Sequence, residues 1–278
     1  MQMKRKKFWI VFTSIVLVLT LIVTGTFLLT RLKTVNVEFR TKLAASETRL
    51  AEGISEKIKE SGEFEYGASL LFANFDESVA KIEKANPYIK VEQLMRKFPN
   101  KLHIYVSERE PKYRVKDKEI ATKWYILDIE FKILEVVDDL NNSTFKDETV
   151  ELEHITGTFY VGDFLKMDAE KTNMSKILAG VYGRTKDITI ISSIKYEAET
   201  NTFFISMKTN KDGDYSNGCI MQIVGTEKLT EKVHAATCTY CKDDYTEGSV
   251  NLSEKVIIII EDKDGGFKGK MKNQEGQD

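Results

Sequence analysis

The feature that most constrains this chain is an apolar run near its N-terminus, Phe8–Thr30, which contains no charged residue, no proline and no side-chain amide. As an α-helix with a rise of about 1.5 Å per residue, the run would be about 35 Å long, enough to cross a hydrocarbon core of about 30 Å. A cleaved signal peptide is the alternative, but its apolar region is usually about 7–15 residues long. The run therefore predicts a single transmembrane helix over residues 8–30.

The charges on either side of this run predict its direction. Met1–Lys7 carries four cations and no acid, whereas Arg31 and Lys33 are the cations directly after the run. Because cytoplasmic flanks hold the excess of Lys and Arg, residues 1–7 are expected to be a cytoplasmic tail. The rest of the chain is then extracytoplasmic, attached to the cell membrane by a single pass. The net charge of −2 argues against a general nucleic-acid binder.

The residues after the run have the pattern of a small α+β domain. Val35–Arg40 alternates apolar and polar residues, as a half-buried strand does. Leu50, Ile54 and Ile58 recur every four residues and predict a first helix. A second helix is expected from about Asp76.

Three prolines, evenly spaced, punctuate the end of this domain: Pro87, Pro99 and Pro111. The first stops the second helix, because proline cannot continue one. The second lies in a turn between two extended segments, Tyr88–Phe98 and Lys101–Ser107. In the latter, Leu102, Ile104 and Val106 fall on one face. The third closes a domain expected to span residues 34–115.

Four motifs at fixed spacing cover this segment: Asn86-Pro87-Tyr88-Ile89, Leu94-x-Arg96, Phe98-Pro99-Asn100-x-Leu102, and Ile104-x-Val106-x-Glu108-Arg109-x-Pro111. Together they resemble the end of the POTRA domain of the bacterial division proteins FtsQ and DivIB. The resemblance implies an α+β protein, in which a strand–helix–helix–strand–strand POTRA domain directly follows the membrane span and a β-rich domain comes next.

Residues 116–262 are expected to form that β domain, with two helices, Asp168–Val181 and Thr226–Tyr240, between the strands. The family favours glycine in the turn after Asp128, so Phe131 argues against a tight turn with positive φ. Residues 263–278, rich in Gly, Lys and Asp, are expected to be a disordered tail. The predicted strands and hairpin loop are Trp124–Asp128, Lys132–Leu134, Thr158–Val161, Ile188–Tyr196, Thr202–Met207, Cys219–Val224 and Val256–Ile260, with the loop at Lys211–Gly218.

Cys238 offers three kinds of chemistry. Ala236-Thr237-Cys238 resembles the nucleophile segment of sortases, with His154 as a base, but no arginine follows Arg184 to stabilise charge on a substrate. His234, Cys238 and Cys241 fall on one helix face and could hold Zn²⁺, with Asp243 or Asp244 as a fourth ligand. Cys238 and Cys241 could instead be a redox pair, although such pairs usually open a helix rather than end it.

The remaining sequence requires no catalytic residue, metal or cofactor. Glu108, Arg109 and Glu110 could suggest acid–base work, but charges at a strand end are usually solvated or paired across a domain boundary. The three cysteines are too few for a disulfide framework. The sequence contains no phosphate-binding loop, HExxH or GxSxG motif.

The resemblance implies a non-enzymatic scaffold of the division machinery at the septum, with FtsL-like and FtsB/DivIC-like bitopic proteins as partners. The alternatives are a membrane-anchored cysteine enzyme of sortase-like type and a POTRA module of another envelope assembly. In the family the partner adds a strand to the C-terminal part of the β domain. Terminal strands often lie at a sheet edge, so the predicted partner-binding residues are Val256, Ile257, Ile258, Ile259 and Ile260.

The predicted topology is open to a direct test. An enzyme reporter that works only outside the cytoplasm should be active when fused after Asp278, because the positive flank keeps residues 1–7 inside. The matched control carries the same reporter before Met1 and should be inactive. Activity of the N-terminal fusion alone would reverse the orientation.

Overall fold

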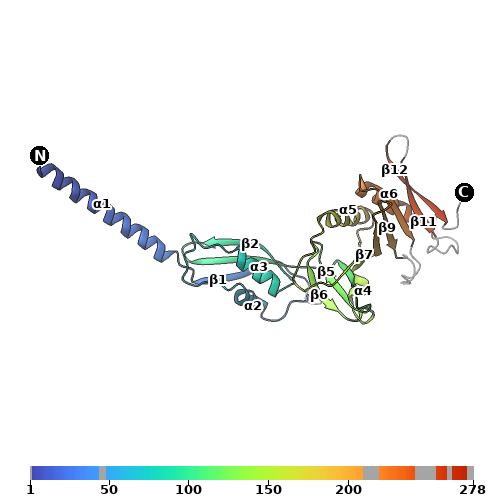
Figure 1. The fold of residues 1–278 in the computed structure, drawn as a ribbon, viewed down its shortest axis with the longest axis horizontal. Coiled ribbons are helices and arrows are strands. Elements are labelled where there is room, and N and C mark those ends of the chain that lie inside the picture. The colour runs from blue at the N-terminus through green and yellow to red at the C-terminus, as the bar shows by residue number, and fades with distance from the viewer. Residues whose placement is uncertain (1, 44–47, 209–218, 242–254, 262–264, 274–278) are drawn as a thin grey trace. The chain divides into compact units, whose positions relative to one another are not determined.

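The chain forms two compact units in a computed structural model, Met1–Arg109 and Glu110–Asp278 (Figure 1). The structure describes residues 2–43, 48–208, 219–241, 255–261 and 265–273. The division falls a few residues before the limit at residue 115 expected from the sequence. It does so because strand β4 (Tyr113–Asp117) pairs with strands of the second unit.

Helix α1 (Gln2–Leu29) contains all of the apolar run except its last residue, Thr30. Its window Phe12–Leu29 has a mean hydropathy of 2.3 and no buried residue, and it is the one helix of the described chain long and apolar enough to cross a membrane. The helix therefore fits a single-pass membrane anchor.

The first unit continues with the predicted strand–helix–helix–strand–strand order. Its three-stranded sheet has the order β1-β3-β2, with the central strand β3 parallel to β1 and antiparallel to β2. Both outer strands are irregular, because the pairing register shifts between Phe39 and Thr41 in β1 and between Val91 and Gln93 in β2. The elements are β1 (Thr34–Thr41), α2 (Ile54–Ser61), α3 (Asp76–Ala85), β2 (Ile89–Lys97) and β3 (Lys101–Glu108).

The alternation in β3 predicted the core of this unit correctly. Leu102, Ile104 and Val106 are fully buried and pack in one cluster with Ile58 of α2 and Ile82 of α3. On the other face of β3, His103 is only partly exposed, because its Nδ1 lies 2.8 Å from a carboxylate oxygen of Glu38. A single buried face thus joins the sheet to both helices.

Helix α2 is shorter than the four-residue periodicity suggested. Gly53 precedes it with φ of 71°, a left-handed conformation that breaks the helical path, and the helix begins at Ile54. Leu50 lies outside the helix but still packs against the same core. The periodicity therefore marked apolar contacts correctly and overstated the length of the helix.

The second unit is built on a nine-stranded mixed sheet of order β12-β11-β10-β9-β8-β7-β4-β5-β6. Residues of the sheet and of the helices α5 (Asp168–Thr185) and α6 (Leu229–Tyr240) form one large apolar cluster. The other elements are β5 (Trp124–Leu127), β6 (Ile133–Val137), η1 (Leu140–Asn142), α4 (Phe145–Glu148), β7 (Val150–Gly157), β8 (Ile191–Glu197), β9 (Thr202–Met207), β10 (Ile220–Val224), β11 (Lys255–Glu261) and β12 (Phe267–Asn273).

The turn before β6 corrects one expectation, because Phe131 adopts a φ of 63° without being glycine. Its ring is fully buried and meets the Tyr113 ring edge-on, with centroids 5.3 Å apart. The Asp128 carboxylate accepts hydrogen bonds from the backbone N–H groups of Glu130 and Lys132. Burial of the ring and the Asp128 bonds together offset the cost of this conformation.

Two further expectations for the second unit were wrong in position. The strand predicted at Thr158–Val161 is Val150–Gly157, and the tail expected to be disordered contains strand β12, Phe267–Asn273. β12 forms because β11 offers it an edge with a complete antiparallel register. The predicted loop Lys211–Gly218 lies outside the described residues. The α+β class and the two long helices of this unit are as expected.

The core of the first unit gives a stability prediction. Ile104→Ala should lower the free energy of unfolding by about 2–5 kcal/mol, because it leaves a cavity at a fully buried position. Ser107→Ala, on the opposite face of β3, removes one exposed hydrogen bond to Glu92 and should cost about 1 kcal/mol or less. Urea denaturation of the detergent-solubilised chain measures both. Equal losses would show that the two faces of β3 are equally buried.

Candidate functional site

The strand predicted to bind a partner, β11, is not at the edge of its sheet. Residues Ile220–Gln222 of β10 pair in parallel with Val256–Ile258, and β12 pairs antiparallel along the whole of Lys255–Glu261. Ile257 is fully buried. The premise that Val256–Ile260 forms the edge is therefore wrong, and among the described strands the edge on this side of the sheet is β12.

β12 lies close against helix α6, and a glycine permits the contact. A Cβ atom added at Gly269 would come within 2.3 Å of Thr239 Oγ1 and 3.2 Å of Ile257 Cγ2. Phe267 accepts cation–π contacts from Lys228 and Lys232, with the nitrogens 5.5 and 5.7 Å from the ring centroid. Lys268 and Lys270, which alternate with Phe267 and Gly269 along the strand, are exposed. The edge strand therefore has an inner face fitted to α6 and a basic outer face.

The pairing of β12 is regular, in contrast to that of the other sheet edges. β1 and β2 carry register shifts, and β6 carries one where it pairs with β5, between Ile126 and Leu127. The β11–β12 register runs without a shift over seven residue pairs. Because bulges and twists blunt the capacity of an edge to accept another strand, β12 is the edge among the described strands best suited to extension.

A groove of about 690 Å³ runs beside this edge, between α5, α6 and β12. Small residues shape it, since a Cβ on Gly180 would lie 2.8 Å from Thr230 O of the facing helix. Ala179, Ala235 and Phe267 contribute to a mostly apolar lining. A groove of this kind next to the last described strand of a sheet suits the side chain of an added strand.

The sulfur of Cys238 also faces this groove and lies 3.5 Å from His234 Nε2. His154, the base proposed from the sequence, packs instead against Tyr196, with ring centroids 6.2 Å apart, and burial lowers its pKa. Cys238 is inside α6, where backbone N–H groups serve the helix, so no oxyanion-stabilising pair is formed by that helix segment. The described geometry does not assemble the sortase-like site.

The metal and redox hypotheses find little support in the same helix. Among the described residues no group of three or more His, Cys, Asp and Glu side chains is arranged to hold a metal ion. Asp243 and Asp244 lie outside the described residues. Burial raises the pKa of Cys219 to about 12 and also raises the pKa of Cys241, so neither thiol is activated at neutral pH.

Two charged side chains at the end of β3, Glu108 and Arg109, stabilise the first unit. Glu108 is buried and accepts hydrogen bonds from Leu43 N, Thr48 Oγ1 and Arg49 N, at 2.7 to 3.0 Å. Arg109 is buried and pairs with Glu83 of α3 at 3.1 Å. The sequence suggested solvated or cross-boundary charges, but both side chains are buried and tie Leu43, Thr48, Arg49 and α3 to the end of the sheet.

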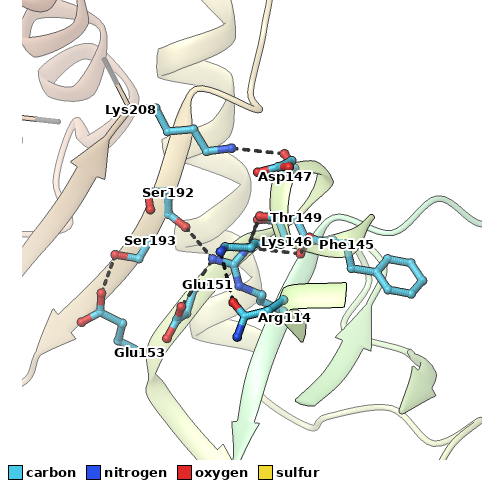
Figure 2. Close-up of polar contacts among 11 residues, drawn as sticks. Arg114, Phe145, Lys146, Asp147, Thr149, Glu151, Glu153, Ser192, Ser193 and Lys208 are labelled. Atoms are coloured by element: carbon cyan, nitrogen blue, oxygen red, sulfur yellow. Dashed lines mark hydrogen bonds and ion pairs between the residues drawn. The ribbon is translucent and has the colours of Figure 1, made fainter. Parts of the chain in front are cut away.

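A buried arginine that the sequence gave no reason to single out organises the other unit (Figure 2). Arg114 of β4 is 6% exposed. Its Nη1 donates to Thr149 O and, at 2.9 Å, to Lys146 O, while Nη2 reaches Glu151 at 3.4 Å and Ser192 O at 3.5 Å. The guanidinium thus binds the segment around α4 to both β7 and β8.

Lys208 supports the same segment from the end of β9. Its Nζ donates to Asp147 O at 3.2 Å, and its own carbonyl accepts a hydrogen bond from Tyr240 Oη of α6. Burial lowers the pKa of both Arg114 and Lys208. Because these cations are enclosed by carbonyl groups and a carboxylate of the chain, the cluster stabilises the fold and offers no opening to a substrate.

The Arg114 cluster yields a second stability prediction. Arg114→Met should lower the free energy of unfolding by about 3–5 kcal/mol, because it leaves buried carbonyls and Glu151 without their partner. Arg114→Lys should recover only part of this, since one ammonium cannot reproduce the fork of the guanidinium. Lys116→Met on the same strand is exposed and should change little. Full recovery by lysine would contradict the geometric argument.

One comparison with known protein families identifies a domain in the first unit. Residues 54–109 match the model of the POTRA domain, FtsQ-type. No curated protein matched the chain. The matched region contains α2, α3 and the β2–β3 hairpin, together with Glu108 and Arg109. It agrees with the motifs that end at Pro111 and supports a division-related scaffold family that is generally non-enzymatic. This chain therefore carries an FtsQ-type POTRA domain, the domain of the FtsQ/DivIB division proteins that its sequence resembles.

Proposed function

We propose that this protein is a bitopic, non-enzymatic scaffold of the bacterial division machinery at the septum. The observation that carries the proposal is the FtsQ-type POTRA match at residues 54–109 in a chain that begins with a membrane-anchor helix. A second unit whose sheet ends, among the described strands, in the regularly paired β12 supports a role in holding other proteins. The N-terminal residues 1–7 lie in the cytoplasm, α1 crosses the membrane, and the chain after α1 lies outside the cytoplasm.

The partners are small bitopic division proteins of the FtsL and FtsB/DivIC types. They are tethered to the same membrane, so binding occurs between chains confined to one surface, and a modest intrinsic affinity suffices. A single strand added to a sheet edge fits this situation, because backbone hydrogen bonds supply affinity and alternate side chains supply specificity.

The partner strand adds to β12, over residues Phe267–Asn273, rather than directly to Val256–Ile260. The regular register of β11–β12 supports this mode, because β12 pairs with β11 along its whole length without a register shift. The adjacent groove accepts one apolar side chain of the partner. Val256–Ile260 takes part indirectly, by holding β12 in place.

The charge of the edge sets the kind of partner strand. Lys268 and Lys270 are exposed on β12 and present positive charge to an added strand. Acidic side chains directly opposite them stabilise the pairing, whereas basic ones oppose it. The partner strand is therefore expected to combine acidic residues with one apolar anchor.

Two variants of β12 test this binding mode. Lys268→Glu with Lys270→Glu should weaken capture of FtsL-like and FtsB/DivIC-like proteins by the full-length chain at least about tenfold, because like charges then face each other. Lys195→Glu, exposed on the central strand β8, is the matched control and should bind normally. Pull-down from detergent extracts at two salt concentrations measures affinity and its dependence on charge.

Truncation after Glu261 separates the two possible strands. If the partner adds to β12, the truncated chain should lose binding while it keeps its secondary structure by circular dichroism. If it instead binds as well as the full chain, the partner pairs with β11 and the original prediction of Val256–Ile260 holds. Undiminished binding by both the truncated and the charge-reversed chains would rule out β12 as the site.

A further inference from the structure

The POTRA domain begins with no linker after the membrane anchor. Helix α1 ends at Leu29, and Leu32, only three residues later, is 2% exposed and belongs to the core of the domain. Three residues of extended chain span about 10 Å. This end of the domain is therefore held within about 10 Å of the end of the helix, whatever angle the two adopt.

Two other segments lie at the same end of the domain, bound to the residues that leave the helix. One is the loop of residues 66–72 and the other is the turn of residues 98–100 between β2 and β3. The loop bonds are Leu32 N to Ala68 O at 2.8 Å, Gly67 N to Leu32 O at 2.9 Å and Leu70 N to Thr30 O at 2.9 Å, and the turn bonds are Lys33 N and Thr34 N to Asn100 O at 2.9 and 3.3 Å.

These two segments carry the large apolar side chains that the domain leaves uncovered. Phe72 is 80% exposed, Tyr66 58%, Phe98 57% and Leu71 40%. Among the described residues from Thr30 to Arg109 they are the exposed large hydrophobic side chains, and all four lie at the end nearest the membrane anchor. Single exposed apolar residues need no explanation, but a group gathered at one end marks a contact surface.

Cations surround the same end. Arg31 and Lys33 flank Leu32, and Lys97 and Lys101 stand opposite each other where β2 and β3 meet the turn. All four side chains are exposed. Arg31 also lies over the Phe27 ring of α1, 5.7 Å from its centroid. One acidic residue, Glu65, directly precedes Tyr66 in the loop. Aromatic rings bordered by Lys and Arg are the combination that settles at the headgroup level of anionic bilayers.

We propose that this end of the POTRA domain is a lipid-binding surface, whose occupant is the outer leaflet of the anionic membrane that α1 crosses. Phe72, Phe98, Leu71 and Tyr66 enter the headgroup region, and Arg31, Lys33, Lys97 and Lys101 contact phosphate groups. The inference rests on α1 being a membrane span, as in the proposed function, but it does not depend on any protein partner.

Tryptophan depth measurements test this with the full chain in vesicles of phosphatidylcholine and phosphatidylglycerol. The two native tryptophans are first replaced, as Trp9→Phe and Trp124→Phe, and Phe72→Trp or Phe98→Trp is then introduced. Both reporters should emit at shorter wavelength than in water and be quenched by lipids brominated near the top of their acyl chains. Circular dichroism verifies that each variant is folded.

Lys84→Trp is the matched control. Lys84 is exposed near the end of α3, which leads into the start of β2, about 30 Å along that strand from the turn at Phe98. Its emission should be that of tryptophan in water, without quenching. If Phe72→Trp and Phe98→Trp behave like this control, the lipid-binding surface does not exist.

Charge reversal, Lys97→Glu with Lys101→Glu, should reduce quenching of the Phe72→Trp and Phe98→Trp reporters in vesicles that contain phosphatidylglycerol. Unchanged quenching would remove the anionic part of the proposal.

Extraction of the vesicles with alkaline carbonate separates this proposal from the span on which it rests. Release of the chain would reject both the span and the lipid-binding surface. Retention of the chain with unquenched reporters would reject the lipid-binding surface alone and leave the scaffold function standing. Retention with quenched reporters supports both.

Discussion

The parallel pairing of β1 with β3 is the interaction on which the first unit depends. β3 supplies the buried face that α2 and α3 cover, and β1 is the strand that the chain forms immediately after the membrane anchor. Val35 of β1 and Leu32 just before it are both buried in this core. The anchor and the domain are therefore mechanically continuous, because a force on the helix is transmitted directly to a paired strand rather than taken up by a flexible linker.

The second unit is held together in a different way. Its nine strands include three parallel pairs, β10–β11, β4–β7 and β7–β8, whose connections run over long stretches of chain. Arg114 of β4 donates to carbonyl groups around α4 and in β8 and to the Glu151 carboxylate of β7. Helices α5 and α6 contribute to the apolar cluster. Strands that are far apart in the sequence need specific internal hydrogen bonds to fix how they pair. The buried guanidinium of Arg114 supplies such bonds, with a geometry that a solvated surface charge does not impose.

The sequence predicted features that depend on local pattern and missed those that depend on distant neighbours. Alternation in Lys101–Ser107 was sufficient to find the buried face of β3, since its period is set by the strand itself. The positive φ of Phe131 could not be foreseen, because the buried Tyr113 ring that packs against it comes from another strand, even though the Asp128 carboxylate that also supports it lies in the same turn. β12 has the composition of a disordered tail and becomes a strand only because β11 pairs with it. The binding site proposed at this edge is consequently the lysine-rich strand β12 rather than the apolar strand β11 that the sequence predicted.

The register shifts in β1 and β2 have a consequence for a protein confined to a membrane. Chains in one bilayer diffuse in two dimensions and meet far more often than the same number in solution. Two exposed strand edges of undistorted geometry would allow neighbouring copies to join into ribbons of continuous sheet. The breaks at Phe39–Thr41 and Val91–Gln93 interrupt that possibility at both sides of the small sheet. Crowding in the membrane can therefore bring many copies together without joining their small sheets edge to edge.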